Sequence, residues 1–218
     1  MEAIERYSTS NDLLTLIILL VLVLLVLARK MFPHRFEDFA SLITSGKFLV
    51  IKSKEHKAMF GFNVILLITH ILSMSVFLYV LYRYFIGIDN NSGVILLRIT
   101  TAYSFFVLLK ITVEKIIANV FDIDEAIDTY LYQKHTYRNF ISLLLFPVSI
   151  ILVYSLNPQA WVFYTIAGLY LATIIFSYSR VIQKNMSIAT RNWFYFILYL
   201  CALEITPYII LYKLITLT

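Results

Sequence analysis

Charged residues are scarce in this chain. Only 14% of its 218 residues are Asp, Glu, Lys or Arg, whereas 61% are hydrophobic and the mean hydropathy is +0.82. A soluble domain of this length carries about 25% charged residues. The composition therefore argues against a soluble globular domain and predicts an integral membrane protein.

Cysteine, proline and glycine are also rare, at one, four and five residues. The single cysteine, Cys201, excludes an internal disulfide. Without a Pro-, Gly- or Ser-rich linker, we expect one membrane domain over 1–218. No H-E-x-x-H, G-x-S-x-G or Gly-rich phosphate loop occurs in the sequence. We therefore assign no catalytic residue, metal site or cofactor, and an enzyme is the less favoured interpretation.

Long apolar runs dominate the sequence, each near the ~20 residues that cross a bilayer. They cover about 13–28, 59–82, 94–118, 140–156, 160–178 and 193–214. The runs predict an all-α, polytopic bundle of six transmembrane helices. The first run is interpreted as a retained span rather than a signal peptide, because no A-x-A cleavage site follows it.

Most Lys and Arg residues fall in the connections after the first, third and fifth runs. These three connections lie on one side of the membrane, and basic loops mark the cytoplasmic side. Both termini are therefore predicted on the outer side. Lys134, His135 and Arg138 are assigned to the second of these loops. The spread of basic residues over three loops argues against nucleic-acid binding.

The connection over 29–58 is the only long one. Apolar residues at helical spacing after Pro33 predict an interfacial amphipathic helix on the cytoplasmic leaflet. A basic strip follows, suited to anionic lipid head groups or to a docking partner: Lys47, Lys52, Lys54 and Lys57. The simpler interpretation is a positive-inside loop that binds no ligand.

Three ionisable residues lie near the middle of three different apolar runs: His70, Lys110 and Glu204. A charge at the bilayer centre costs about 3 kcal/mol on insertion scales. At ~1.5 Å per residue, all three lie ~13–16 Å from the cytoplasmic ends of their spans. We predict a Lys110–Glu204 ion pair with His70 beside it. Glu114 is the rival partner for Lys110, although Lys preceding Glu is the weaker order for such a pair within a helix.

Two further residues support this buried polar set. Tyr103 shares a helix face with Lys110, at a spacing of seven residues. Pro207 removes a backbone donor and is expected to kink the last span near Glu204. The set either fixes helix packing or forms a proton relay, with Glu204 titrating, Lys110 as counter-charge and His70 as shuttle. The absence of a visible internal repeat fits poorly with many transporters.

An acidic cluster lies in the segment 119–139, formed by Asp122, Asp124, Glu125 and Asp128. Such clusters hold magnesium and a diphosphate in some membrane enzymes. The spacing here does not reproduce their aspartate motifs, and a solvated acidic helix is the favoured interpretation.

The stretch L-Y-L-C-A-L-E-I-T-P-Y in the last span, which contains Glu204 and Pro207, carries a resemblance. It is similar to the closing segment of an uncharacterised domain-of-unknown-function family of multi-pass inner-membrane proteins from Bacteroidota. The resemblance implies a bacterial inner membrane and a link to envelope biogenesis or secretion. It transfers no catalytic residue.

These observations favour a non-enzymatic accessory or assembly subunit of a larger envelope or secretion complex in the membrane. Its expected partners are membrane proteins and anionic lipids. The first alternative is a small proton-coupled transporter or channel that uses the His70, Lys110 and Glu204 set. The second is a membrane enzyme that acts on a lipid-linked substrate, an interpretation that rests on the acidic cluster alone.

Overall fold

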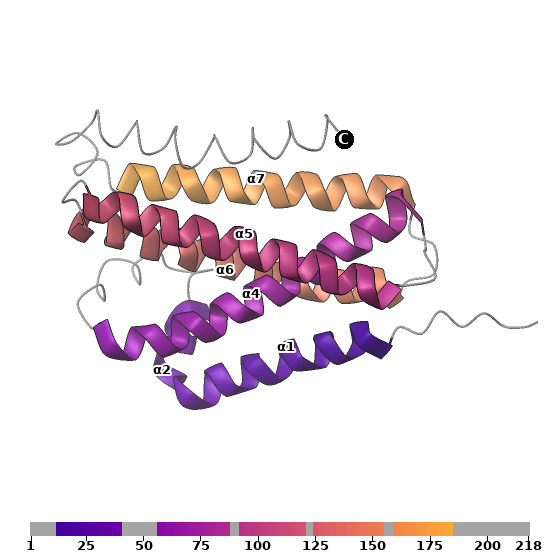
Figure 1. Ribbon diagram of the computed structural model, residues 1–218, viewed down its shortest axis with the longest axis horizontal. Coiled ribbons are helices and arrows are strands. Elements are labelled where there is room, and N and C mark those ends of the chain that lie inside the picture. The colour runs from indigo at the N-terminus through magenta and orange to yellow at the C-terminus, as the bar shows by residue number, and fades with distance from the viewer. Residues whose placement is uncertain (1–11, 41–55, 88–91, 121–123, 155–158, 185–218) are drawn as a thin grey trace, which may run out of the picture.

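The computed structural model describes residues 12–40, 56–87, 92–120, 124–154 and 159–184. These residues form six helices and no strand (Figure 1). The helices are α1 (Asp12–Met31), α2 (Pro33–Ala40), α4 (His56–Phe85), α5 (Ser92–Val120), α6 (Asp124–Tyr154) and α7 (Ala160–Lys184). All but α2 are long and apolar enough to cross a bilayer. The chain is a helical, multi-pass membrane protein.

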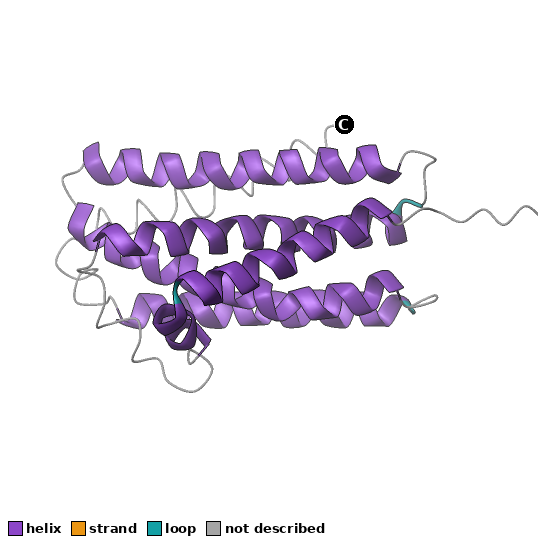
Figure 2. Cartoon of the chain, turned by 90° about the horizontal axis from the view of Figure 1, so that it is seen from below, coloured by secondary structure: helices purple, strands orange, loops and turns teal. Residues whose placement is uncertain are grey.

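The long helices run side by side along one common direction (Figure 2). Helix α4 is the centre of the bundle, because it packs against α1, α5 and α6. Helix α7 is added on the far side of α6 (Figure 1). Of the membrane-spanning window of α4, 61% is buried, against 6% for α7. The core of the described bundle therefore lies around α4 and α6.

Small polar residues bring α4 and α6 together. Ser73 and Ser75 on α4 and Ser142 and Ser149 on α6 are all buried. The Ser73 hydroxyl donates a hydrogen bond across the interface to the Ser142 carbonyl oxygen, at 3.0 Å. Since a hydrophobic driving force between helices is absent in lipid, small residues and hydrogen bonds of this kind hold spans together.

Helix α1 packs through one face only. Leu14, Ile17 and Val21 are buried against the bundle, whereas Leu16 and Val26 on the other faces are more than half exposed. The sequence of this helix is apolar on every face. The outward residues therefore form a surface suited to lipid contact.

Helix α2 forms where the interfacial helix was predicted, but its aromatic side faces the bundle. Phe39 is buried, with its ring edge-to-face on Phe62 at 6.1 Å and on Phe140 at 5.6 Å between centroids. Buried aromatic pairs of this geometry stabilise a contact beyond their area alone. Lys47, Lys52 and Lys54 lie outside the described residues, and so does the side chain of Lys57. Lipid docking by this strip stays a prediction.

The predicted loop between the third and fourth spans is wrong, because helix α6 occupies most of it. The helix begins at Asp124 rather than near Phe140, and it continues through Pro147. Lys134, His135 and Arg138 therefore belong to a helix, not to a loop. Their polar character suggested a solvated connection, but this part of α6 is covered by neighbouring helices, and Lys134 and Asn139 are buried. The side chains of the acidic cluster lie outside the part of the chain that the structure describes.

The predicted sixth span, 193–214, and both termini lie outside the described residues. The span count of six and the placement of the termini stay predictions.

Helix α4 is followed by a left-handed glycine, Gly87, with φ of +106°. Such a glycine commonly terminates a helix, since it lacks the Cβ that strains this conformation.

Replacement of Ser73 by leucine should loosen the contact between α4 and α6. The larger side chain has no room beside the Ser142 carbonyl, and overpacking of this kind costs about 1–3 kcal/mol. We expect a lower Tm for the purified protein in mild detergent. Thr101→Leu on the exposed side of α5 is the matched control and should leave the Tm unchanged. Equal Tm values for the two variants would contradict the close packing.

Candidate functional site

A buried ion pair joins the last part of α5 to the first part of α6. Lys134 Nζ lies 2.5 Å from Glu114 Oε1, and their side chains are 1% and 0% exposed. Both residues lie three positions inside their spans, which places them ~5 Å from the ends of the spans. Only residues 121–123 separate the two helices, so α5 and α6 form an antiparallel hairpin that the pair ties together.

The second carboxylate oxygen of Glu114 faces His135. The distance from His135 Nε2 to Glu114 Oε2 is 3.9 Å, too long for a hydrogen bond. Neither this oxygen nor the ring nitrogens of His135 have a hydrogen-bond partner among the described residues. The imidazole of His135 therefore lies beside the Glu114 carboxylate without a hydrogen bond to it.

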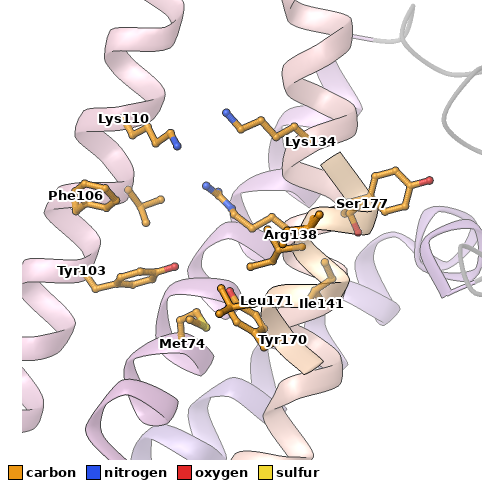
Figure 3. Close-up of a pocket in the computed structure, with 14 residues that line it drawn as sticks. Met74, Tyr103, Phe106, Lys110, Lys134, Arg138, Ile141, Tyr170, Leu171 and Ser177 are labelled. Atoms are coloured by element: carbon orange, nitrogen blue, oxygen red, sulfur yellow. The ribbon is translucent and has the colours of Figure 1, made fainter. Parts of the chain in front are cut away.

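Two more cations lie one turn deeper in the bundle. Lys110 precedes Glu114 by four residues, and Arg138 follows Lys134 by four. The charged ends of Lys110, Lys134 and Arg138 converge on the space between α5 and α6 (Figure 3). The Nε and Nη2 atoms of Arg138 are buried and have no acceptor among the described residues. An unmatched buried donor of this kind is costly.

Deeper still, His70 on α4 meets Tyr103 on α5. The Tyr103 hydroxyl lies 2.9 Å from His70 Nε2, and the ring centroids are 5.9 Å apart. His70 is fully buried, and its Nδ1 has no hydrogen-bond partner in the described part of the chain. The contact links α4 to α5 near the middle of the bundle.

Four of these side chains border a cavity of about 450 Å³ between α5, α6 and α7, with Met74 of α4 at one end: Tyr103, Lys110, Lys134 and Arg138. Most of its wall is apolar or aromatic. Its three cations, Lys110, Lys134 and Arg138, lie toward the end opposite Met74 (Figure 3). The lining residues are Met74, Tyr103, Phe106, Val107, Lys110, Lys134, Tyr137, Arg138, Ile141, Tyr170, Leu171, Ile174, Ile175 and Ser177. A mostly apolar cavity with a few convergent polar groups is typical of a ligand site.

Comparison with family models gives a match to a domain of unknown function, DUF4271, over residues 14–215. The chain belongs to this family. The resemblance predicted from the last span, to an uncharacterised domain-of-unknown-function family, is thereby confirmed. No curated protein and no solved structure matches the chain.

Part of the predicted polar set of this DUF4271 protein falls within the described bundle. His70 and Lys110 are buried, and Tyr103 contacts His70 directly. Glu204 and Pro207 lie outside the described residues, so the Lys110–Glu204 pair stays a prediction. The described residues contain no group of three or more His, Cys, Asp or Glu side chains placed to hold a metal ion.

The sequence did not predict the first part of α6, which carries Lys134 and Arg138. The sequence predicts Glu114 as a rival partner for Lys110, and the structure shows its carboxylate bound to Lys134 of the next helix. One signal was available, because Lys134 and Arg138 continue, at helical spacing, the face that carries the buried Ile141 and Leu145. That periodicity indicates a helix extending well before Phe140.

Replacement of Glu114 by glutamine should destabilise the DUF4271 fold strongly, because it leaves the Lys134 ammonium buried without its carboxylate. Breaking a buried pair from one side costs about 3–5 kcal/mol. We expect a clear loss of Tm for Glu114→Gln, and partial recovery when Lys134→Met is added.

Glu37→Gln, on the exposed face of α2, is the control and should behave as the unaltered protein. A double variant no more stable than Glu114→Gln alone would argue against the ion pair as the source of the loss.

Proposed function

We propose that the protein is a non-enzymatic accessory or assembly subunit of a larger membrane complex in the bacterial inner membrane, within envelope biogenesis or secretion. The observation that carries the proposal is the use of buried ionisable side chains to link helices. Glu114 and Lys134 join α5 to α6, and His70 and Tyr103 join α4 to α5. Buried polar contacts of this kind specify how helices pack.

The outer surface of the bundle supports a role in assembly. Only 6% of the membrane-spanning window of α7 and 17% of that of α5 is buried. Large side chains such as Phe105 on α5 and Trp161 and Phe176 on α7 are more than half exposed. Aromatic residues are enriched at protein–protein interfaces relative to the rest of the surface. These faces offer a contact area to neighbouring subunits as well as to lipid.

A proton-coupled transporter is the second candidate, and the hydrogen bond between His70 and Tyr103 favours it. The pair adjoins the cavity that contains Lys110 and Arg138, so titratable groups follow one another along the inside of the bundle. Intramembrane histidines of this kind occur in proton relays. The acidic cluster behind the third interpretation, a membrane enzyme, has no described side chain to support it.

The subunit proposal is tested by purification at native expression level. The chain is tagged at Thr218, extracted in mild detergent and analysed by mass spectrometry. We expect one or a few membrane proteins in fixed stoichiometry. A benzoylphenylalanine cross-linker at the exposed Phe176 should capture the same protein, whereas the cross-linker at the buried Phe77 should capture none. A solitary protein without cross-links would count against the subunit role.

Replacement of Glu204 separates the two candidates. In a packing role, Glu204→Gln should lower the Tm, and Lys110→Met should partly restore it, since removal of both charges is cheaper than removal of one. In a relay, Glu204→Gln should abolish pH-dependent flux into proteoliposomes, measured with an internal pH dye. Unchanged flux together with a rescued Tm would exclude the relay.

A further inference from the structure

The cavity between α5, α6 and α7 is polar at one end and apolar at the other. Lys110, Lys134 and Arg138 gather at one end, and Met74 and Leu171 lie at the opposite end (Figure 3). We propose that this cavity binds a membrane amphiphile with a phosphate head group, with the phosphate on Arg138 and the hydrocarbon tail along the apolar wall. The proposal goes beyond a subunit role and does not depend on the identity of any protein partner.

Arg138 is the main recognition residue. Its Nε and Nη2 atoms are buried and lack an acceptor among the described residues, although both are strong donors. The guanidinium presents its donors in a planar fork that matches two oxygens of a phosphate. A bound phosphate would therefore supply the acceptors that the described bundle does not.

The donors of the site favour phosphate over carboxylate. Three cations converge on the space, and within the described helices Glu114 binds one of them, Lys134. The buried donors of Arg138 still need acceptors. A phosphate monoester carries about −1.5 to −2 at pH 7 and offers three acceptor oxygens, whereas a carboxylate carries one charge and offers two oxygens.

The depth and shape of the site favour an amphiphile over free phosphate. Arg138 lies seven residues inside its span, ~10 Å from the span end. An amphiphile reaches this depth from the lipid phase with its tail already in hydrocarbon. The apolar side chains of Leu171, Ile174 and Ile175 on α7 then lie against the tail. An inorganic phosphate has no group that uses this wall.

The test compares three probes on the purified full-length chain in neutral detergent: hexadecyl phosphate, hexadecyl phosphocholine and inorganic phosphate. We expect a saturable rise in Tm with hexadecyl phosphate only. The zwitterionic probe has the same tail but no net charge, and inorganic phosphate has the charge but no tail. Equal shifts with the two hexadecyl probes, or a shift with inorganic phosphate as large as that with hexadecyl phosphate, would overturn the proposal.

Variants locate the site. Arg138→Gln should weaken the response to hexadecyl phosphate at least tenfold, whereas Arg98→Gln, an exposed arginine on α5, should not change it. If Arg138→Gln fails to fold, Ile174→Trp fills the cavity without altering its charge and should also reduce the response. An unaltered response in the cavity variant would overturn the proposal. So would a response that appears only after Glu204→Gln, because Glu204 would then be the native counter-charge.

Discussion

A charge buried among apolar side chains needs a counter-charge close by, and the facing sides of α5 and α6 are organised around this requirement. Glu114 and Lys134 have almost no exposed surface, so each depends on the other for its charge. Because the pair joins the facing sides of the two helices, it restricts how each helix can rotate about its own axis. Lys110 and Arg138, one turn deeper on the same helices, are thereby turned toward the same space.

The contact with α4 fixes α6 from the other side. Ser142 and Ser149 are small enough to let the helices approach, and the Ser73 hydroxyl is matched by a carbonyl oxygen of α6. Helix α6 thus has one side committed to α4 and another directed at the cavity. Helix α7 completes the cavity wall but buries little of its own surface, which leaves most of it available for lipid or protein contact.

The sequence was sufficient for those features that depend on average hydropathy. The apolar runs of α1, α4, α5 and α7 predicted helices because a span must satisfy its own backbone hydrogen bonds. His70 and Lys110 stood out because ionisable residues are rare in such runs. The start of α6 was missed because Lys134, Arg138 and Asn139 lower the local hydropathy, although neighbouring helices cover them. The Glu114–Lys134 pair depends on how two helices are rotated relative to each other, and one sequence does not specify that rotation.

The structure shows a partner for some of the buried ionisable residues, and further partners are predicted for Lys110 and proposed for Arg138. Glu114 and Lys134 form a pair with a structural role, and His70 has Tyr103. The predicted Glu204 contact and the proposed phosphate would compete for Lys110, but they differ at Arg138. A glutamate paired with Lys110 leaves the buried donors of Arg138 still in need of an acceptor, whereas a phosphate has enough oxygens for both cations. Arg138 therefore distinguishes the two interpretations, because a purely structural polar cluster leaves its buried donors without an acceptor and a ligand site supplies one.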